Sequence, residues 1–577
     1  MKDSLIFVTL LFVSLLNVNS YKNVLSYKLR RLSLSTSSSS MITETETDVV
    51  IIGSGIGGLC SAALLAKAGK SVVVCEAHYE LGGCAHEFAM TEDGRVIPTD
   101  TTSSDPVYKF EAGPSLYSGL SQYRSANPLK HVFQMIDEEP EWITYSLWTG
   151  FFPEAPEGFK QSVGAVAFED TLMKYGGPNA LKEWKILVSA LRPLAEGVME
   201  LPTVAIRPDV GALRTIVFPY LIPLFKTIMQ GEKLTRPFSQ YYEELEITDQ
   251  FLKNYLNLLC FLLQGLPDTG TSSAVMAYMI DDLFKPNGVL DYPKDGSAGI
   301  INALERGILK NGGIIKRRTR VDSIIVDDDN RCTGVKTARE IIKAKEAVVS
   351  NADLWTTFNL IPKTTNKKFE EEREDLLKNA PLCKSFCHLH LGIESEGLPA
   401  DLPPQWTVCN DWNKPIDSDF NVIVVSMPSI LDPTLAPTGR HVIHAYYAGS
   451  EPYEIWEGLD RKSEEYVQKK KERAEALWKA VEKVIPDVRT RVKLELIGTP
   501  LTHERFNRRY RGTYGPAFAG GRGFPGQKTH LKALYRCGDS TNPGIGVPSV
   551  AASGAMAAGA ILSTEEHLEL LKKIRMP

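Results

Sequence analysis

The sequence predicts an α/β fold in which a Rossmann-type nucleotide-binding domain is interleaved with a mixed α+β domain. Residues 47–58 (TDVVIIGSGIGG) have the pattern of a buried strand, a glycine-rich turn and the start of a helix. Residues 71–75 (SVVVC) form a second expected strand, which ends at Glu76. Near the other end of the chain, residues 534–562 again show a strand, a glycine turn, a carboxylate and a small-residue helix. We therefore expect both ends of the chain to bind one cofactor.

The glycines of the first turn have separate expected roles. Gly53 allows the tight turn, Gly55 lets the backbone approach a pyrophosphate, and Gly58 lets the helix of residues 57–68 pack closely on its strand. The free N–H groups at the start of that helix would face the anion. Glycine spacing alone is a weak signal, but Glu76 follows about 20 residues later, where a carboxylate can bind a ribose hydroxyl.

A second glycine pair, ending at Gly83, favours a flavin over a nicotinamide cofactor. It follows Glu76 closely, which indicates another close approach of the backbone to a long cofactor. The C-terminal turn contains Gly538, Asp539 and Gly546 and would complete the same site. The sequence therefore predicts FAD.

Four segments carry a family resemblance: EAHYELGGCAHEF (76–88), YKFEAGPSLYSGL (108–120), TPLTHERFNRRYRGTYGPA (499–517) and LYRCGDSTNPGIGVPSVAASG (534–554). They resemble the carotenoid isomerase branch of the FAD-dependent phytoene desaturase superfamily, over about residues 47–562. The resemblance implies a FAD-binding domain, a second domain built from the middle of the chain, and a polyene substrate in an apolar tunnel. By motif position, the implied cofactor contacts are Gly53, Gly55, Gly58, Glu76, Gly83, Gly538, Asp539 and Gly546. Val321 is the implied contact to the adenine of the cofactor.

The chain departs from this family at residues 542–546, Asn-Pro-Gly-Ile-Gly, where plant-type isomerases have an aromatic residue, Pro, Gly, Gln and Gly. We expect Asn542 and Ile545 to select the polyene, and Asn542 to hold a water or hydroxyl beside the flavin. Further polar residues in the matching motifs could donate a proton or bind a substrate hydroxyl, although an ordinary buried hydrogen-bonding role is the alternative for each. These catalytic candidates are His86, Glu111, Tyr514 and the pair Arg508–Arg509.

Three reactions are compatible with these motifs. The first is redox-neutral cis-to-trans isomerisation of a carotenoid by reduced FAD, in which the cofactor carries the chemistry and the protein orients it. The second is net desaturation or saturation of a polyene. The third is hydration, or another modification of the end group of a xanthophyll. The electron donor to the flavin is not predicted, and a purely carotenoid-binding role would leave the flavin site without a purpose.

The cofactor motifs divide the chain into alternating segments. Residues 41–125, 291–353 and 501–577 are expected to build the FAD-binding domain. The remaining segments are a mainly helical substrate or membrane-contact region, residues 126–290, and a substrate-domain sheet, residues 354–500. Two surface features are also expected, an inserted loop at 92–106 and a solvated, charge-rich helix at 464–483.

The N-terminus has the composition of two targeting segments. Residues 1–20 have the charged start and apolar core of a signal peptide, and residues 21–40 are basic, serine-rich and free of acids, as in a transit peptide. This combination predicts a plastid enclosed by additional membranes; plain secretion is the alternative, which fits poorly with an odd number of unpaired cysteines. Since a long polyene is insoluble in water, we expect the enzyme to contact the membrane from the stroma side. Residues 213–229 are expected as a tunnel wall or as a segment dipping into one leaflet, with an ordinary buried core helix as the alternative.

Composition argues against several other classes of protein. A net charge of −5 and a pI near 6.1 provide no basic field for nucleic acid. The nine cysteines are odd in number and scattered, unlike a disulfide framework, which indicates a reducing compartment. Cys383, Cys387, His388 and His390 could suggest a metal, but strand alternation would place Cys387 and His388 on opposite faces. We therefore expect no metal site.

Overall fold

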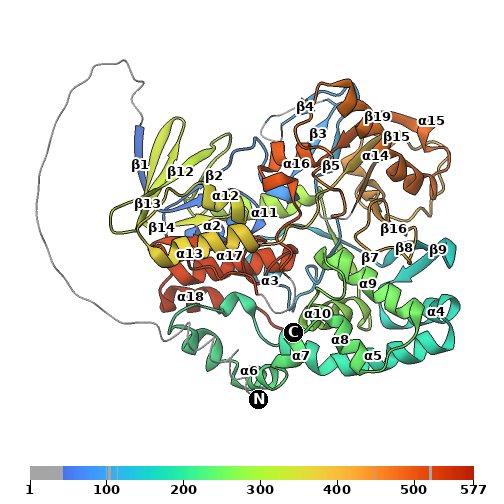
Figure 1. The fold of residues 1–577 in the computed structure, drawn as a ribbon, viewed down its shortest axis with the longest axis horizontal. Coiled ribbons are helices and arrows are strands. Elements are labelled where there is room, and N and C mark those ends of the chain that lie inside the picture. Colours follow the sequence, from blue (N-terminus) through green and yellow to red (C-terminus); the bar gives the residue numbers. More distant parts are fainter. Residues whose placement is uncertain (1–42, 99–100, 102–104, 114, 448, 519–522) are drawn as a thin grey trace, which may run out of the picture.

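The computed structural model describes residues 43–98, 101, 105–113, 115–447, 449–518 and 523–577. The expected signal and transit segments, residues 1–20 and 21–40, lie outside the described residues. Figure 1 shows the nucleotide-binding part on the left, the substrate sheet on the upper right and a group of helices below it. This arrangement of mixed sheets and covering helices confirms the predicted α/β class.

Seven of the described strands form the central sheet of the nucleotide-binding domain, in the order β11-β2-β1-β14-β13-β12, with β20 also paired to β14. β11, β2, β1, β14 and β20 are parallel, whereas β12 and β13 form an antiparallel meander on β14. The strands are β1 (Thr43–Ile52), β2 (Val72–Cys75), β11 (Ile314–Lys316), β12 (Val321–Val326), β13 (Cys332–Thr337), β14 (Glu340–Ser350) and β20 (Leu534–Arg536).

Helices cover both faces of this sheet, which is why its central strands are apolar on both sides. Val49 and Ile51 face one core with the first group of helices, and Val50 and Ile52 face the other core. The first group consists of α2 (Ile56–Lys67), α3 (Pro128–Ile136), α11 (Ser297–Leu309) and α17 (Val547–Ile561); the second consists of α12 (Leu354–Asn359) and α13 (Lys367–Asn379). α2 and α17 pack so closely that a Cβ on Gly554 would lie 2.1 Å from the carbonyl oxygen of Gly57.

The substrate domain is built on a second sheet, in the order β19-β15-β18-β17-β16-β8-β9. Its strands are β8 (Leu147–Phe152), β9 (Ala155–Ser162), β15 (His388–Glu394), β16 (Gln405–Cys409), β17 (Val422–Ser426), β18 (Arg440–Tyr447) and β19 (Val492–Gly498). Two small sheets lie beside it: β6 (Tyr117–Ser118), β10 (Leu290–Pro293) and β7 (Trp142–Tyr145); and β4 (Val96–Ile97), β3 (Glu87–Met90) and β5 (Tyr108–Glu111).

The helical region has its own aromatic core, in which Phe159, Phe168 and Tyr255 are in ring contact. Its helices are α4 (Ala165–Tyr175), α5 (Gly177–Met199), α6 (Leu221–Met229), α7 (Gly231–Thr235), α8 (Phe238–Glu244), α9 (Gln250–Gln264) and α10 (Ser273–Phe284). Within the described chain, none of the helices combines the length and the apolar composition needed to cross a bilayer. The last helices are α14 (Glu464–Glu482), α15 (Val488–Arg491), α16 (Pro500–Asn507) and α18 (Thr564–Leu571).

The middle of the chain is mainly helical, as expected. Residues 126–290 also contain β7, β8 and β9, and two of these strands extend the substrate sheet. The expected charge-rich helix at 464–483 is α14, and it has one buried face, because Leu477, Trp478 and Val481 pack into the core on one side of that sheet. Its apolar residues recur at helical spacing among charged neighbours, as in an amphipathic surface helix.

Candidate functional site

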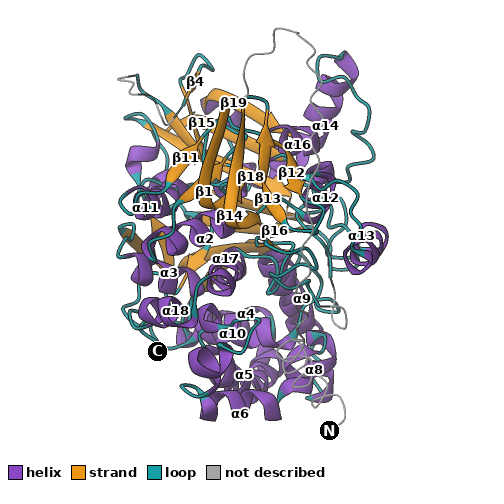
Figure 2. Ribbon diagram, turned by 90° about the vertical axis from the view of Figure 1, so that its left-hand side faces the viewer, coloured by secondary structure: helices purple, strands orange, loops and turns teal. Residues whose placement is uncertain are grey.

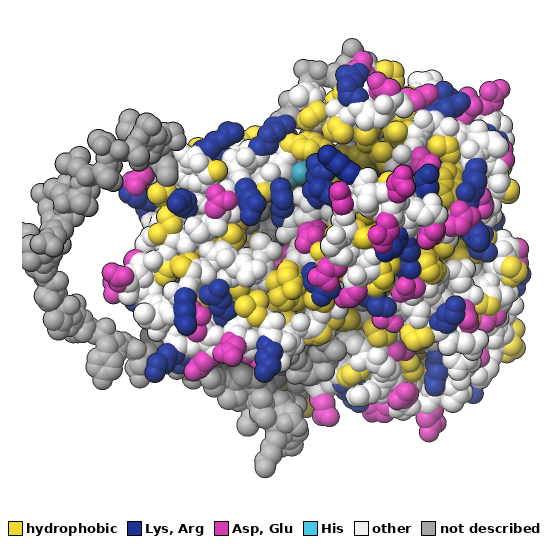
Figure 3. Space-filling model, turned by 45° about the horizontal axis from the view of Figure 1, so that its top comes forward, with side chains coloured by type: hydrophobic (Ala, Val, Ile, Leu, Met, Phe, Trp, Pro, Cys, Tyr) yellow, Lys and Arg dark blue, Asp and Glu magenta, His cyan; other side chains and the backbone are white. Residues whose placement is uncertain are grey.

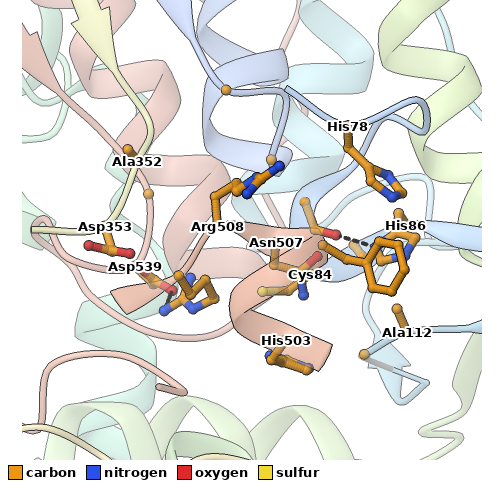
Figure 4. A pocket seen from close by; sticks show the side chains of 18 of the residues that line it. His78, Cys84, His86, Ala112, Ala352, Asp353, His503, Asn507, Arg508 and Asp539 are labelled. Carbon is orange, nitrogen blue, oxygen red and sulfur yellow. Dashed lines mark hydrogen bonds and ion pairs between the residues drawn. The ribbon is translucent and has the colours of Figure 1, made fainter. Parts of the chain in front are cut away.

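A large cavity lies where the parallel strands end against the substrate sheet. Its volume is about 990 Å³, the upper end of the range of roughly 300–1,000 Å³ found for ligand pockets. Its walls come from both ends of the chain and from β15, β18, α9 and α16. Figure 4 shows His78 and His86 on one side, Asp353 and Asp539 on the other, and Arg508 between them.

The glycine turns are packed backbone against backbone. Gly53 has a φ of +88°, which lets the chain turn sharply between β1 and α2. A Cβ on Gly58 would lie 2.3 Å from the carbonyl oxygen of Gly53, and a Cβ on Gly83 would lie 3.0 Å from the Cα of Gly55. The second glycine motif therefore sits directly on the first, as the expectation of two close backbone approaches requires.

Asn351, which the sequence analysis did not identify, is central to this turn. Its N–H donates to the carbonyl of Ile52 at 2.9 Å, which fixes it beside β1. A Cβ added to Gly55 would lie 2.6 Å from the Nδ2 of Asn351. A Cβ added to Gly57 or to Gly538 would lie 2.8 or 2.9 Å from its Oδ1. One side chain thus contacts the N-terminal and C-terminal turns. A polar residue at the carboxyl end of a buried parallel strand is the signal that could have identified it.

Glu76 is held at the end of β2, in the cavity wall. Its Oε2 accepts hydrogen bonds from the N–H and the hydroxyl of Ser54, at 2.8 and 2.6 Å, and its Oε1 accepts one from the N–H of His78 at 2.7 Å. The carboxylate is therefore fixed in the position that fits the predicted contact with a ribose hydroxyl.

The C-terminal turn brings Asp539 to the same cavity, paired with Arg509 at 2.7 Å. Arg509 also donates to the carbonyls of Thr513 and Tyr514 at 2.6 and 2.9 Å, so it holds the turn of residues 509–515 together. The neighbouring residues Arg508 and Arg509 therefore have different roles. Arg508 faces the cavity, whereas the guanidinium of Arg509 is occupied by Asp539 and backbone carbonyls.

These residues fit FAD. The start of α2 offers backbone N–H groups, Glu76 offers a carboxylate, and Val321 lines the cavity at the start of β12, as expected for an adenine contact. Gly538 and Gly546 line it from the other end of the chain, with φ values of +96° and +105°. Arginine side chains suited to a pyrophosphate also line the cavity: Arg320, Arg461, Arg505 and Arg508. In Figure 3, Lys and Arg side chains lie beside a hydrophobic area from which one histidine reaches the surface.

His86 faces the cavity with a defined tautomer. Its Nδ1–H donates to the carbonyl of Gly83 at 2.7 Å, which leaves Nε2 as the acceptor in the neutral ring. Burial lowers the pKa of His86, so this ring is neutral at physiological pH. The sequence analysis missed His78, whose ring centroid lies 5.1 Å from that of His86. The pKa of His78 is lowered to about 4, mainly by burial and secondly by its electrostatic interaction with His86.

The other end of the cavity is apolar and aromatic. Tyr514 meets Phe386 edge to face, with ring centroids 5.0 Å apart, and Phe261 of α9 adds a wall from the helical region. Ile545 is 4% exposed and lines the cavity beside them, as predicted. A long apolar ligand could therefore lie next to the nucleotide end.

Two predicted catalytic residues lie elsewhere. Glu111 lies behind the wall, where its Oε1 accepts hydrogen bonds from the hydroxyls of Ser297 and Tyr292 at 2.8 and 3.1 Å, and burial raises its pKa to about 7. Asn542 is exposed and does not line the cavity. Its N–H is bound to the carbonyl of Pro525, and this attachment leaves its side chain at the surface. The expectation that Asn542 faces the flavin is wrong.

A group of histidines in the substrate sheet was also missed. His388 lines the cavity, and His390 and His444 lie beside it with side-chain nitrogens within 4.8 Å of one another. The predicted alternation holds, since Cys387 belongs to the core on the opposite side of β15. The sequence analysis expected no metal site here and did not foresee a histidine cluster, because a neighbouring strand, β18, supplies His444. Cross-strand pairing of this kind is not visible in one segment of sequence.

The fold and the cavity define a flavoenzyme with a divided Rossmann-type domain. Residues 51–137 match the NAD(P)-binding Rossmann-like domain, and residues 232–562 match the flavin containing amine oxidoreductase family. The chain belongs to the flavin containing amine oxidoreductase family. It is an FAD-dependent enzyme.

Sequence relatives confirm the resemblance to the carotenoid isomerase branch. The chain is 28% identical to a chloroplastic prolycopene isomerase of Arabidopsis thaliana, over 89% of this chain and 82% of that one. It is 26% identical to an all-trans-retinol 13,14-reductase of Rattus norvegicus, over 81% and 77%. An oxidoreductase from Methanosarcina mazei shares the fold, with a TM-score of 0.58 and 18% identity over 89% of this chain and 99% of that one.

Proposed function

We propose that this protein isomerises a carotenoid polyene from cis to trans with reduced FAD and no net transfer of electrons. The observation that carries the proposal is the continuity of the cavity. Gly55 and Glu76 at the nucleotide end and Phe261, Phe386 and Ile545 at the apolar end line the same cavity. A conjugated chain bound at the apolar end would lie next to the cofactor, and the similarity to prolycopene isomerases supports the same substrate class.

Reduced FAD would supply electron density or a proton to the conjugated double bonds. The chain's own contribution is to orient the polyene, to exclude water and to hold protons. α17 begins in the cavity wall at Val547, and its N-terminus favours a negative charge there by about 0.3–2 kcal/mol. His86 keeps an unprotonated Nε2, which can accept a proton or a hydrogen bond.

Two other reactions each have one supporting observation. The similarity to retinol 13,14-reductases favours net saturation. Polar side chains in the substrate part of the wall favour addition of water, in which one carbon gains a proton and its neighbour a hydroxyl group: Tyr446, His388, His503 and Thr513. The earlier argument for hydration from Asn542 no longer applies, because that side chain is at the surface.

The test is anaerobic incubation of photoreduced holoenzyme with a poly-cis carotene or a xanthophyll in liposomes, following product mass and flavin absorbance together. Isomerisation predicts an unchanged mass and a flavin that stays reduced. A product two mass units away, with flavin reoxidised in proportion, would replace the proposal by desaturation or saturation. A gain of 18 mass units with reduced flavin intact would replace it by hydration.

We also propose that the protein acts in a plastid. The prolycopene isomerases it resembles are described as chloroplastic, and residues 1–20 and 21–40 have signal and transit composition. A fluorescent fusion of residues 1–45 should enter the plastid of an alga with additional plastid membranes, and deletion of residues 21–40 should leave it outside. Secretion of the intact fusion would contradict this assignment.

A membrane-contact surface is proposed on α6. No described residue of this helix is buried, and four of its apolar side chains, Leu221, Ile222, Phe225 and Met229, are exposed. Together with Phe218 they form an apolar ridge of Phe218, Leu221, Ile222, Phe225 and Met229, which are 59–71% exposed. Exposed apolar side chains grouped in this way are typical of contact with one leaflet of a bilayer.

Vesicle co-sedimentation tests the apolar ridge. Ile222→Ser with Phe225→Ser should weaken binding to neutral vesicles by about 100-fold, since each buried apolar side chain is worth about 1.5–3 kcal/mol. Leu309→Ser, a change at an apolar residue of α11 that is 50% exposed, is the matched control and should bind as the wild type does. Equal loss in both variants, or in neither, would reject the ridge as the contact surface.

A further inference from the structure

A basic hollow lies between α14 and α16, beside the cofactor cavity. Its described lining contains four cationic side chains, Arg461, Lys462, Lys470 and Arg505, and one carboxylate, Asp460. Its volume is about 340 Å³, within the range of roughly 300–1,000 Å³ found for ligand pockets. The hollow is therefore large enough for part of a small organic ligand, and its charge favours an anion.

The four cationic side chains lack a counter-charge in the protein. None of them forms an ion pair with a described residue. Arg473, further along α14, is paired with Glu451 at 2.6 Å. The one carboxylate of the hollow, that of Asp460, already accepts a hydrogen bond from the backbone N–H of Lys462 at 3.0 Å. The hollow therefore has an excess of positive charge that a bound anion would neutralise.

Lys470 is the partly buried member of this group. It follows Tyr466 by one turn on the same face of α14, and its Nζ lies 5.8 Å from the centre of the Tyr466 ring. Burial lowers the pKa of Lys470, because its ammonium group loses water without gaining an ion-pair partner. Arg461, Lys462 and Arg505 are exposed. An anion in the hollow would therefore supply the counter-charge that the fold does not provide for Lys470.

The hollow shares part of its wall with the cofactor cavity. Arg461, Arg505 and Phe506 line both spaces, whereas Lys462 and Lys470 line the hollow alone. The FAD pyrophosphate is expected at the glycine turn and the start of α2. Lys462 and Lys470 are therefore available to a second anionic ligand, which would lie next to the cofactor cavity.

Anionic lipid headgroups are the competing ligand for a basic surface. The position of the hollow argues against them. α14 and α16 lie in the upper part of the molecule in Figures 1 and 2, whereas α6, which carries the apolar ridge, lies at the bottom of both views. The hollow is therefore remote from the proposed membrane-contact surface, and its ligand would come from the aqueous phase.

We propose that the basic hollow binds the phosphate groups of a soluble dihydronicotinamide dinucleotide that reduces the flavin; this role rests on the proposed use of reduced FAD. Phosphate oxygens accept charge-assisted hydrogen bonds from Lys and Arg side chains. The phosphates and the nicotinamide are separate parts of such a dinucleotide, so one part can occupy the hollow and the other the adjoining cavity. The electrons balance, because one hydride carries the two electrons that FAD takes up and leaves an oxidised nicotinamide.

Calorimetric titration of the oxidised holoenzyme with NADP⁺ tests the site without turnover. We expect one equivalent to bind. Lys470→Gln should weaken binding about 10- to 100-fold, the usual cost of losing one hydrogen bond to a charged group, and Lys470→Arg should restore most of the affinity. FAD occupancy should stay at the wild-type level, because Lys470 does not line the cofactor cavity. A wild-type holoenzyme that does not bind NADP⁺ would overturn the proposal.

Lys471→Gln is the matched control. Lys471 is the next residue on α14, is exposed and does not line the hollow, so this variant removes the same charge from the same helix. It should bind NADP⁺ as the wild type does. Equal weakening in Lys470→Gln and Lys471→Gln would count against the site, because it would show an effect of net charge alone.

Co-sedimentation with phosphatidylglycerol vesicles distinguishes a lipid headgroup from a soluble phosphate. Lys470→Gln and Lys471→Gln should bind these vesicles equally well, since the hollow is remote from the apolar ridge. Vesicle binding that is lost only in Lys470→Gln would replace the proposed dinucleotide by a lipid headgroup.

Anaerobic mixing of the oxidised holoenzyme with NADPH, followed by flavin absorbance, supplies the functional readout. Reduction of the wild type should saturate with NADPH concentration. Lys470→Gln should raise the half-saturating concentration about 10- to 100-fold and leave the limiting rate unchanged, because the lost hydrogen bond is to a phosphate and not to the reacting atoms. Binding of NADP⁺ without reduction of the flavin by NADPH would refute the reductant role. Reduction of the flavin without conversion of any polyene would reject the proposed function and leave this site intact.

Discussion

The two ends of the cavity are built in different ways. At the nucleotide end much of the wall is backbone, and Gly55, Gly57 and Gly83 have no room there for a side chain. At the substrate end the wall is made of side chains on a sheet, such as His388 and Phe386. A backbone wall fixes one ligand and tolerates little change, whereas side chains on a rigid sheet can be exchanged one at a time. Substitutions should therefore abolish binding at one end and alter selectivity at the other.

The largest expected effect lies in the backbone wall. Gly55→Val should abolish FAD binding, measured as loss of protein-bound flavin absorbance after purification and reconstitution. A Cβ at this position would lie 2.6 Å from Asn351 Nδ2, and the rest of the side chain would fill the space where a pyrophosphate approaches the turn. A yellow Gly55→Val protein with normal FAD affinity would contradict the assignment of this turn.

A double variant distinguishes two reasons why residue 55 is a glycine: room for the pyrophosphate and room for the Asn351 side chain. Gly55→Ala together with Asn351→Ala removes the side-chain contact and restores room inside the protein. If FAD binding is still weak, the glycine serves the cofactor. Full recovery would show that it serves the packing of Asn351.

The next effect compares two ion pairs of low exposure, one in the cavity wall and one in the substrate domain. Arg509 pairs with Asp539 in the cavity wall, and Arg473 pairs with Glu451 at 2.6 Å in the substrate domain. Arg473→Met should lower the free energy of unfolding by about 3–5 kcal/mol, because the fully buried Glu451 carboxylate is left unpaired. Arg509→Met should lower it by less, because the Asp539 side chain is 18% exposed. Only Arg509→Met should also weaken FAD binding. Urea unfolding measures the first effect and flavin titration the second. Loss of FAD binding in Arg473→Met would contradict the prediction that only the ion pair in the cavity wall affects the cofactor.

The sequence predicted the nucleotide end because its determinants are local. A strand, a glycine turn and a carboxylate at fixed spacing specify their own geometry, so Gly53, Glu76 and Asp539 were identified, and all three line the cavity. Asn351 was missed, although it touches several of these glycines. Its role depends on where β14 lies relative to β1, and no motif in its own segment records that contact.

The substrate end depends on contacts between distant segments. His444 lies beside His388 only because β18 pairs with β15, and His503 reaches them from α16. Asn542 was expected in the cavity from a motif comparison, but its backbone contact with Pro525 turns it toward solvent. Pairing and side-chain direction arise from tertiary packing, which one sequence does not specify.

A pH-dependent effect follows from Glu111, which is buried behind the substrate wall. Burial raises its pKa from 4.5 to about 7, so the unfolded chain loses this proton before the folded one does. Stability should therefore fall as pH rises from about 4.5 to about 7, by about 3 kcal/mol from this group. Glu111→Gln should remove that dependence. Unfolding at pH 5 and pH 8 tests this, and a constant difference between wild type and variant would contradict the assigned burial effect.

The smallest effects are expected from residues 542–546, the turn where the chain departs from the family pattern. The sequence analysis gave Asn542 and Ile545 the same role there, whereas the structure places them differently. Ile545 is buried in the cavity wall, whereas Asn542 is exposed. Ile545→Gln should keep FAD occupancy and shift the relative rates with an acyclic carotene and a xanthophyll by about 10- to 200-fold, the usual range for one pocket contact. Asn542→Phe should change neither. A shift in selectivity from Asn542→Phe alone would show that this turn moves into the cavity when the polyene binds.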